Sequence, residues 1–142
     1  MMLDEISPAE LVADLIVRWG LPGHAPAGVV VGPASDTQQQ AGVISIMSAG
    51  LPVIEKYSDL QWYRAQVRCL HGTLEFADTL AQGVQRDIHG LVRRKVHMAS
   101  TDRWYLLHLC NVTAGPSMHY DSPETWETLL FAEIMLSDDP LN

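Results

Sequence analysis

Cysteine is scarce in this sequence, with only Cys69 and Cys110 among 142 residues. The two lie 41 positions apart, so no CxxC pair is present to form a zinc knuckle or a thioredoxin-type motif. Each lies in an apolar stretch, where a free cysteine behaves as a small hydrophobic residue. We therefore predict two reduced, buried thiols in preference to a disulfide.

Basic residues are also few. There are 9 Lys and Arg residues against 17 Asp and Glu residues, which gives a formal net charge of −8. Affinity for DNA comes largely from Lys and Arg side chains that release the counterions condensed on phosphate. A general nucleic-acid binder is therefore disfavoured, although nucleic acid could pass an acidic surface without adhering to it.

Long apolar runs are absent as well. No run approaches the roughly 20 residues that cross a bilayer. The N-terminal stretch MMLDEISPAE is acidic where a signal peptide is basic. We expect the chain to be made and to act in the cytosol, without a membrane partner.

Catalytic and metal-binding motifs are missing too. The six histidines form no HExxH, HxH or HxxxH pattern, and there is neither a GxSxG elbow nor a glycine-rich phosphate loop. We predict no catalytic residue, no metal site and no cofactor. A metal site formed by ligands from distant parts of the chain stays open as an alternative. His119 and Asp121, for example, could bind a metal ion together with His97 or His108.

The composition fits a single folded domain over residues 1–142. Hydrophobic residues make up 47% of the chain and charged residues 18%, a balance typical of globular proteins and far from that of disordered ones. A second independent core would be hard to accommodate in a chain of this length.

Hydrophobic periodicity predicts two helices and several strands. Ser7 and Pro8 form a helix start, and apolar residues at helical spacing continue to residue 19. A longer apolar stripe predicts a second helix over residues 73–92, with a cluster of cations at its end. Strand patterns fall at residues 27–31, 43–49, 60–70, 103–113 and 125–136, with polar loops expected at residues 33–42 and between the last two strands.

The order of these elements predicts the fold class. The last two strands follow one another with no helix between them, which argues against a doubly wound parallel sheet. We expect an α+β fold, with a mixed, largely antiparallel sheet and two helices packed on one face.

Charge is unevenly distributed along the chain. Residues 86–103 carry five basic and two acidic side chains, whereas residues 121–142 carry six acidic and no basic ones. Either segment alone is most simply a solvated helix end or a polar tail. Together they provide opposite patches, and copies joined head to tail would bring these into the heterologous contact that closes into rings. The candidate subunit-interface residues are Arg64, Arg68, Arg93, Arg94, Lys95, Glu124, Glu127, Asp138 and Asp139.

Three tryptophans, Trp62, Trp104 and Trp126, lie in predicted strands but partly out of phase with the apolar faces. A sheet covered on both faces would bury them in a core. An exposed sheet face would use them as anchors for a neighbouring subunit. The sequence leaves both interpretations open.

Several short motifs follow one another in a familiar order. They are a helix over residues 11–19 before a Gly-rich turn, a strand ending in Ala49-Gly50-Leu51-Pro52, a strand with Gln66-Val67-Arg68 followed by Gly72 and a long Ala/Leu helix, and Ala114-Gly115-Pro116 before a final strand and an acidic tail. In this order the chain resembles the minor capsid or tail terminator family of long-tailed bacteriophages. The likeness covers most of the chain.

The resemblance implies a structural role in the virion. Tail terminators are mixed α/β subunits that form a homo-hexameric ring in the neck, cap the tail tube and contact the tail tube protein and the head-side connector or stopper protein. They assemble in the host cytoplasm, use no cofactor, carry out no reaction and let DNA pass through the lumen without specific binding. The alternatives are a head completion or stopper protein of the neck and, from a different class, a small cytosolic enzyme or ligand-binding domain.

Overall fold

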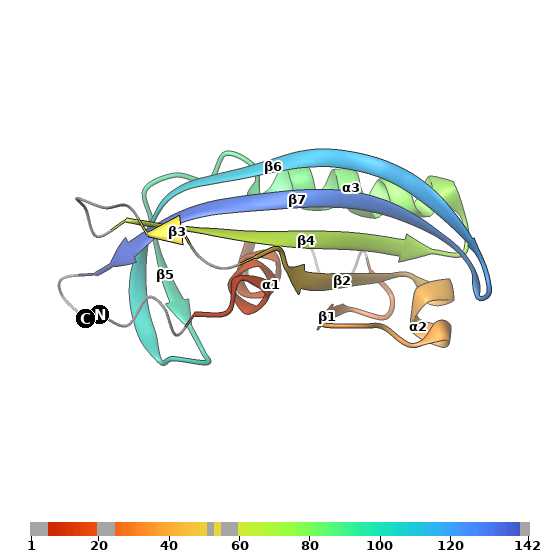
Figure 1. Cartoon of the computed structure of the whole chain (residues 1–142), viewed down its shortest axis with the longest axis horizontal. Helices are drawn as coiled ribbons and strands as arrows, with labels where there is room; N and C mark the ends of the chain where they lie inside the picture. The colour runs from red at the N-terminus through yellow and green to blue at the C-terminus, as the bar shows by residue number, and fades with distance from the viewer. Residues whose placement is uncertain (1–5, 20–24, 51–52, 55–59, 140–142) are drawn as a thin grey trace.

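The computed structural model describes residues 6–19, 25–50, 53–54 and 60–139 (Figure 1). Their helices and strands are, in chain order, α1 (Pro8–Trp19), β1 (Val29–Val31), α2 (Asp36–Ala41), β2 (Val43–Ser48), β3 (Val53–Ile54), β4 (Gln61–His71), α3 (Leu74–Ile88), β5 (Arg94–Met98), β6 (Arg103–Asp121) and β7 (Glu124–Asp138). No described helix is both long and apolar enough to cross a bilayer.

The strands form one curved sheet in the order β1-β2-β4-β7-β6-β5, and β3 pairs with β4. β1 lies parallel to β2, and the other described pairings are antiparallel. α1 and α3 lie on the same side of this sheet and share one hydrophobic core with it (Figure 1). The predicted α+β fold, with a mixed, largely antiparallel sheet and two helices on one face, is confirmed.

The first helix begins where the sequence predicts it. The Ser7 Oγ atom accepts a hydrogen bond from the backbone N–H of Glu10 at 3.4 Å, which satisfies one of the amides that a helix start leaves unpaired. The apolar stripe of α1 is buried, and its members are Leu11, Val12, Leu15 and Ile16.

Strand β4 shows the predicted alternation. Tyr63, Ala65, Val67 and Cys69 are almost fully buried on the helix-covered side. Fully burying a large apolar side chain contributes roughly 1.5–3 kcal/mol, so this period-two pattern determines which face of β4 meets the helices. The intervening residues Arg64, Gln66 and Arg68 remain partly exposed.

A helix was missed between residues 33 and 42, where the sequence predicts a loop. α2 is closed by a capping box, in which Ser35 Oγ accepts from the Gln38 N–H and the Gln38 side chain accepts from the Ser35 N–H. None of its residues is buried. Without an apolar stripe, periodicity could not reveal this helix.

The predicted second helix is too long at its C-terminal end. α3 ends at Ile88, and Gly90 adopts a φ of 84°, which continues no helix. The Gly90 N–H instead donates to the Cys110 carbonyl of β6. Arg94 and Lys95 therefore begin a strand, β5, that the sequence analysis did not predict, and the expected cluster of cations at a helix end is wrong.

The last two strands are longer than predicted, and the expected loop between them is a tight turn. β6 and β7 pair as far as Asp121 and Glu124, with Ser122 and Pro123 between them. A register shift between Ala114 and Ser117 takes up the Gly115-Pro116 dipeptide. Such a bulge accommodates a proline, which has no N–H for the ladder, without ending the hairpin.

Both cysteines are free and buried, and burial raises the pKa of the Cys110 thiol to about 12 and that of Cys69 still further. Because the thiolate is the reactive form, we expect Ellman's reagent to label neither thiol in the native protein and both in denaturant. Absorbance of the released dye measures this. Rapid labelling of one thiol in the native state would contradict the burial described here.

Candidate interaction surface

The sheet has one face that α1 and α3 leave uncovered, which we call the open face. Its described part is formed mainly by alternate residues of β4 and β7, whose register pairs Trp62 with Met135, Arg64 with Glu133 and Gln66 with Phe131. Neighbouring residues of a strand point to opposite faces of the sheet. Because one set of alternate residues is buried under the helices, the other set forms the open face. At one end of this face, Ala34, just before α2, packs on Val43 and Leu70.

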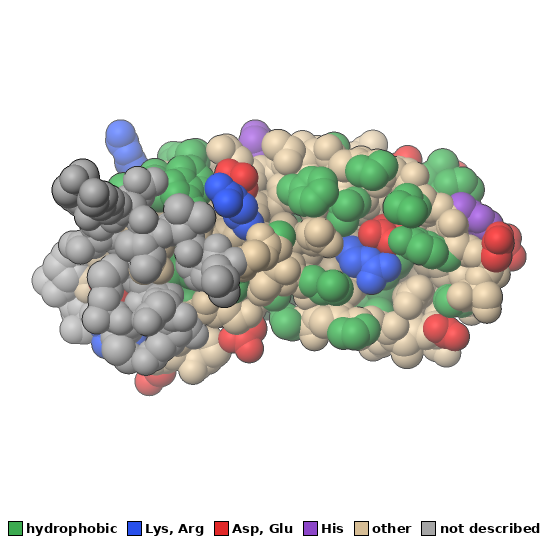
Figure 2. All heavy atoms as spheres, viewed as in Figure 1, with side chains coloured by type: hydrophobic (Ala, Val, Ile, Leu, Met, Phe, Trp, Pro, Cys, Tyr) green, Lys and Arg blue, Asp and Glu red, His purple; other side chains and the backbone are tan. Residues whose placement is uncertain are grey.

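Apolar side chains are numerous on the open face. Met47 and Phe131 are 39% and 37% exposed, and Trp62, Leu129 and Met135 are half-buried. Figure 2 shows this side of the molecule, where hydrophobic side chains spread over the strands around two places at which a cation touches an acid. Apolar residues gathered around polar pairs are typical of protein–protein contact surfaces.

The three predicted strand tryptophans lie outside the buried core. Trp62 is half-buried, Trp126 packs against His119 with ring centroids 4.8 Å apart, and Trp104 is 44% exposed beside His97. The interpretation as core filling is therefore not supported for these residues. Their availability to a neighbouring subunit stays a prediction.

One ion pair on the open face is nearly buried. The Arg68 guanidinium donates two hydrogen bonds to the Glu127 carboxylate at 3.1 and 3.0 Å, and the Tyr120 hydroxyl donates a third at 2.7 Å. The side chain of Glu127 is only 6% exposed. A bidentate pair of this kind holds its members in one geometry. The sequence analysis named Arg68 and Glu127 but missed Tyr120. If Ser122-Pro123 had been interpreted as a two-residue hairpin turn, Tyr120 would have been placed close to Glu127 on the neighbouring strand.

The hydrogen bonds decide the protonation of this cluster. Burial alone would raise the pKa of Glu127, but the bonds from Arg68 and Tyr120, with the charge of Arg68, lower it below its ordinary value of 4.5. The bond to Glu127 in turn raises the pKa of both Arg68 and Tyr120. These shifts keep Glu127 ionised and Arg68 and Tyr120 protonated, so the cluster as a whole carries no net charge.

This lowered pKa predicts an acid-dependent loss of stability. A carboxyl whose pKa is lower when folded stabilises the protein fully above its unfolded value of 4.5 and loses that contribution as the pH falls through the folded pKa. The unfolding free energy of the wild-type chain should therefore exceed that of Glu127→Gln by a constant amount from pH 7 to about 5, and by less below. Urea unfolding across this range measures the difference, with Glu133→Gln as the matched control. A gap that widens on acidification would contradict the assignment.

A second, more exposed pair lies on the same face. Arg64 Nε donates to Glu133 Oε1 at 3.2 Å, and both side chains are nearly half exposed. Exposed pairs contribute about 0–1 kcal/mol. This pair therefore adds polarity to the open face and little to stability.

The candidate acids near the C-terminal end of the described chain also find partners within the subunit. Lys95 Nζ lies 3.3 Å from Asp139, and Arg103 lies 3.9 Å from Asp138. Six of the nine candidate interface residues are thus paired inside one subunit, and much of the charge assigned to opposite patches is neutralised there. Among the described residues, Arg93, Arg94 and Glu124 make no ion pair.

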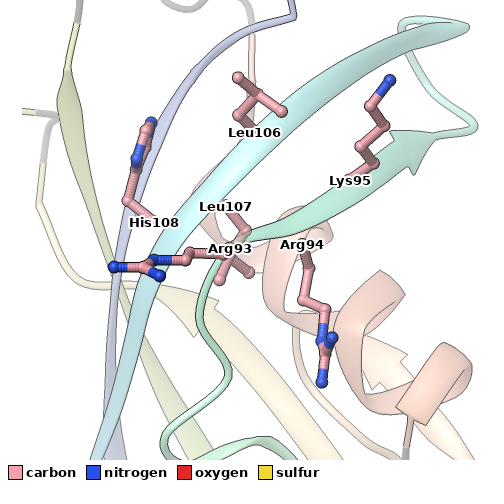
Figure 3. Close-up of a pocket in the computed structure, with 6 residues that line it drawn as sticks. All are labelled: Arg93, Arg94, Lys95, Leu106, Leu107 and His108. Carbon is pink, nitrogen blue, oxygen red and sulfur yellow. The ribbon is translucent and has the colours of Figure 1, made fainter.

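The three consecutive cations border a cavity of about 300 Å³ at the β5–β6 junction, which we call the basic pocket. Its lining residues are Arg93, Arg94, Lys95, Leu106, Leu107 and His108. Figure 3 shows Lys95, Leu106 and His108 on one side of the ribbon and Arg94 on the other, while Arg93 reaches across β6 toward His108. The three cationic residues on its border favour an anionic group.

One serine–histidine contact requires comparison with a catalytic pair. Ser137 Oγ lies 2.8 Å from His108 Nε2, the distance at which a base activates a nucleophile. Ser137 is 9% exposed and lies within a regular strand, and no carboxylate in the described chain contacts the other His108 nitrogen. The described residues therefore lack the orienting third group and the access that a triad needs. Nor do three His, Cys, Asp or Glu side chains gather among them to hold a metal ion.

The sequence was compared with models of known protein families and with curated proteins. No family model matches it, and no curated protein is significantly similar to it.

Proposed function

We propose that this chain is a structural virion protein, a tail terminator whose copies form a six-membered ring that caps the tail tube and joins it to the head-side connector or stopper protein. The ring belongs to the neck of the virion and assembles in the host cytoplasm. The subunits carry out no reaction and need no cofactor. DNA passes through the lumen without specific binding.

The open face is the observation that carries this proposal. A sheet face with several half-exposed apolar side chains gains by covering them, at roughly 25 cal/mol per Å² of apolar surface. The hydrogen bonds of the Arg68–Glu127–Tyr120 cluster hold three side chains of this face in one geometry, which lowers the ordering cost when a partner binds. A rigid, broad surface suits a permanent contact between subunits or with the tube better than binding of a small molecule.

The charge balance also supports the proposal. A net charge of −8 disfavours adhesion to phosphate, which suits a channel that DNA must leave. The motif order of the tail terminator family agrees with this interpretation.

The purified protein offers a direct test of the ring. We expect light scattering to give six times the chain mass of 15.7 kDa, and negative-stain images to show six-fold rings. Addition of the protein to growing tail tubes should stop their elongation. Tubes that grow equally long with and without it would overturn the function proposed here.

The same samples separate the alternatives. A stopper protein would bind the head-side connector but leave tube length unchanged. A small enzyme or ligand-binding domain would be a monomer or dimer, and its turnover or binding would be lost on replacing one pocket residue such as His108.

A further inference from the structure

The β6–β7 hairpin has an acidic end, which we call the acidic tip: Asp121, Ser122, Pro123 and Glu124. The side chain of Asp121 is fully exposed, and Glu124 is exposed without an ion pair to any described residue. Asp36 and Glu75, both exposed, lie in the first turns of the helices at this end of the molecule. Figure 2 shows acidic and histidine side chains at this end. No Lys or Arg of the described chain pairs with the tip, and Asp121 Oδ1 meets His119 Nδ1 at 3.5 Å.

The basic pocket lies near the opposite end of the same hairpin. β5 pairs with β6 as far as Leu107. The 14 residues of β6 after Leu107, as far as Asp121, extend over about 46 Å at 3.3 Å per residue. Figure 1 shows β5 and the hairpin turn at opposite ends of the long axis. The continuous β6–β7 ladder holds tip and pocket apart, so a tip cannot reach the pocket of its own chain.

Tip and pocket are complementary in chemistry. The pocket has an accessible apolar side chain, the half-buried Leu106, bordered by cations of which Arg93 and Arg94 have no carboxylate partner in the described chain. The tip has an apolar ring, Pro123, between two carboxylates. A guanidinium binds a carboxylate through two parallel N–H donors.

We infer that the acidic tip of one copy inserts into the basic pocket of the next. Asp121 and Glu124 then approach Arg93, which reaches across β6 toward His108, and Pro123 covers Leu106. Arg94, on the other side of the ribbon, adds positive charge at the same end of β5. Because donor and acceptor surfaces lie at different ends of the subunit, the contact is heterologous and propagates until it closes on itself. The inference rests on the proposed ring and identifies the residues that would join its subunits.

Charge reversal tests the contact. The pocket variant carries Arg93→Glu and Arg94→Glu, and the tip variant carries Asp121→Lys and Glu124→Lys. We expect each to associate about a hundredfold more weakly than the wild type, because like charges would then face one another. The four substitutions together leave the net charge unchanged and should restore assembly, as judged by light scattering.

A mixing experiment shows whether the contact runs head to tail. The tip variant keeps an intact pocket, and a neutral pocket variant, Arg93→Gln with Arg94→Gln, keeps an intact tip. Because the Lys tip finds no opposite charge in the Gln pocket, an equimolar mixture of these two variants should stop at one-to-one pairs. Binding through one self-complementary patch would give no such pairs. Raising the salt to about 1 M, where the Debye length falls to about 3 Å, should reduce the wild-type mass.

Matched controls keep the result interpretable. Asp36→Lys with Glu75→Lys reverses the same amount of charge at the same end without changing the tip, and should assemble as the wild type does. Circular dichroism verifies folding, and Arg93→Gln with Arg94→Gln serves as the milder pocket variant. Normal assembly of a folded pocket or tip variant overturns the inference. Failure of the four-fold variant to assemble overturns it as well, and so does a wild-type chain that stays monomeric up to its solubility limit. Charge-insensitive rings that still cap tubes would overturn the tip-in-pocket contact alone and leave the proposed function intact.

Discussion

Replacing Arg68 by alanine should destabilise the domain by about 3 kcal/mol, because it leaves the nearly buried Glu127 carboxylate without its counter-charge. For a chain of 142 residues this corresponds to a fall in Tm of roughly 10 °C. The Tyr120 hydroxyl still donates one hydrogen bond, but a neutral donor cannot replace a guanidinium that makes two. Thermal and urea unfolding followed by circular dichroism measure the effect.

The same sheet face supplies a matched control. Arg64→Ala removes another cross-strand arginine–glutamate pair, but one that is nearly half exposed on both sides, so its cost should stay below about 1 kcal/mol. Replacing the whole buried pair, with Arg68→Met and Glu127→Leu, should recover most of the lost stability because no charge is then left unpaired. Equal costs for Arg64→Ala and Arg68→Ala would show that the Glu127 carboxylate is hydrated.

The second large effect is expected at Gly42, which links α2 to β2. Its φ of 108° lies in a region that residues with a side chain rarely adopt. A Cβ added there would lie 2.8 Å from His71 Cδ2 and 3.1 Å from Pro26 Cδ. Backbone strain and this overlap together predict that Gly42→Ala costs about 3 kcal/mol, measured by urea unfolding.

Gly32 separates the two causes. Its φ is 98°, but a Cβ there would meet nothing within 4 Å. Gly32→Ala should therefore show the strain alone, about 1–2 kcal/mol. If both variants lose equal stability, His71 and Pro26 move aside and the overlap contributes nothing.

Local sequence patterns were sufficient for the parts of the fold that are stabilised locally. The Ser7 cap and the apolar stripe that follows it determine α1, and strict alternation determines which face of β4 is buried. Both signals depend on residues a few positions apart. The α+β class followed from the order of such elements alone.

Elements whose stability depends on distant partners could not be predicted in this way. β5 has only five residues and begins with two cations, and it is a strand because β6 pairs with it. The full length of β6 and β7 depends on a bulge at Gly115-Pro116 that only a partner strand can stabilise. Proline and glycine there predict a loop when the hairpin is not considered.

The charged residues show the same division. By itself the sequence determined which side chains carry charge, how many of each sign there are, and that they concentrate in two segments. Only the tertiary structure decided that Lys95 meets Asp139, 44 residues away, and that Arg68 meets Glu127. The physical reason is that the energy of an ion pair falls as the distance between its charges grows. The number of residues between two charges along the sequence does not determine that distance. Pairing within the subunit removed much of the predicted patches, and of the nine candidate residues only Arg93, Arg94 and Glu124 make no ion pair within the described chain.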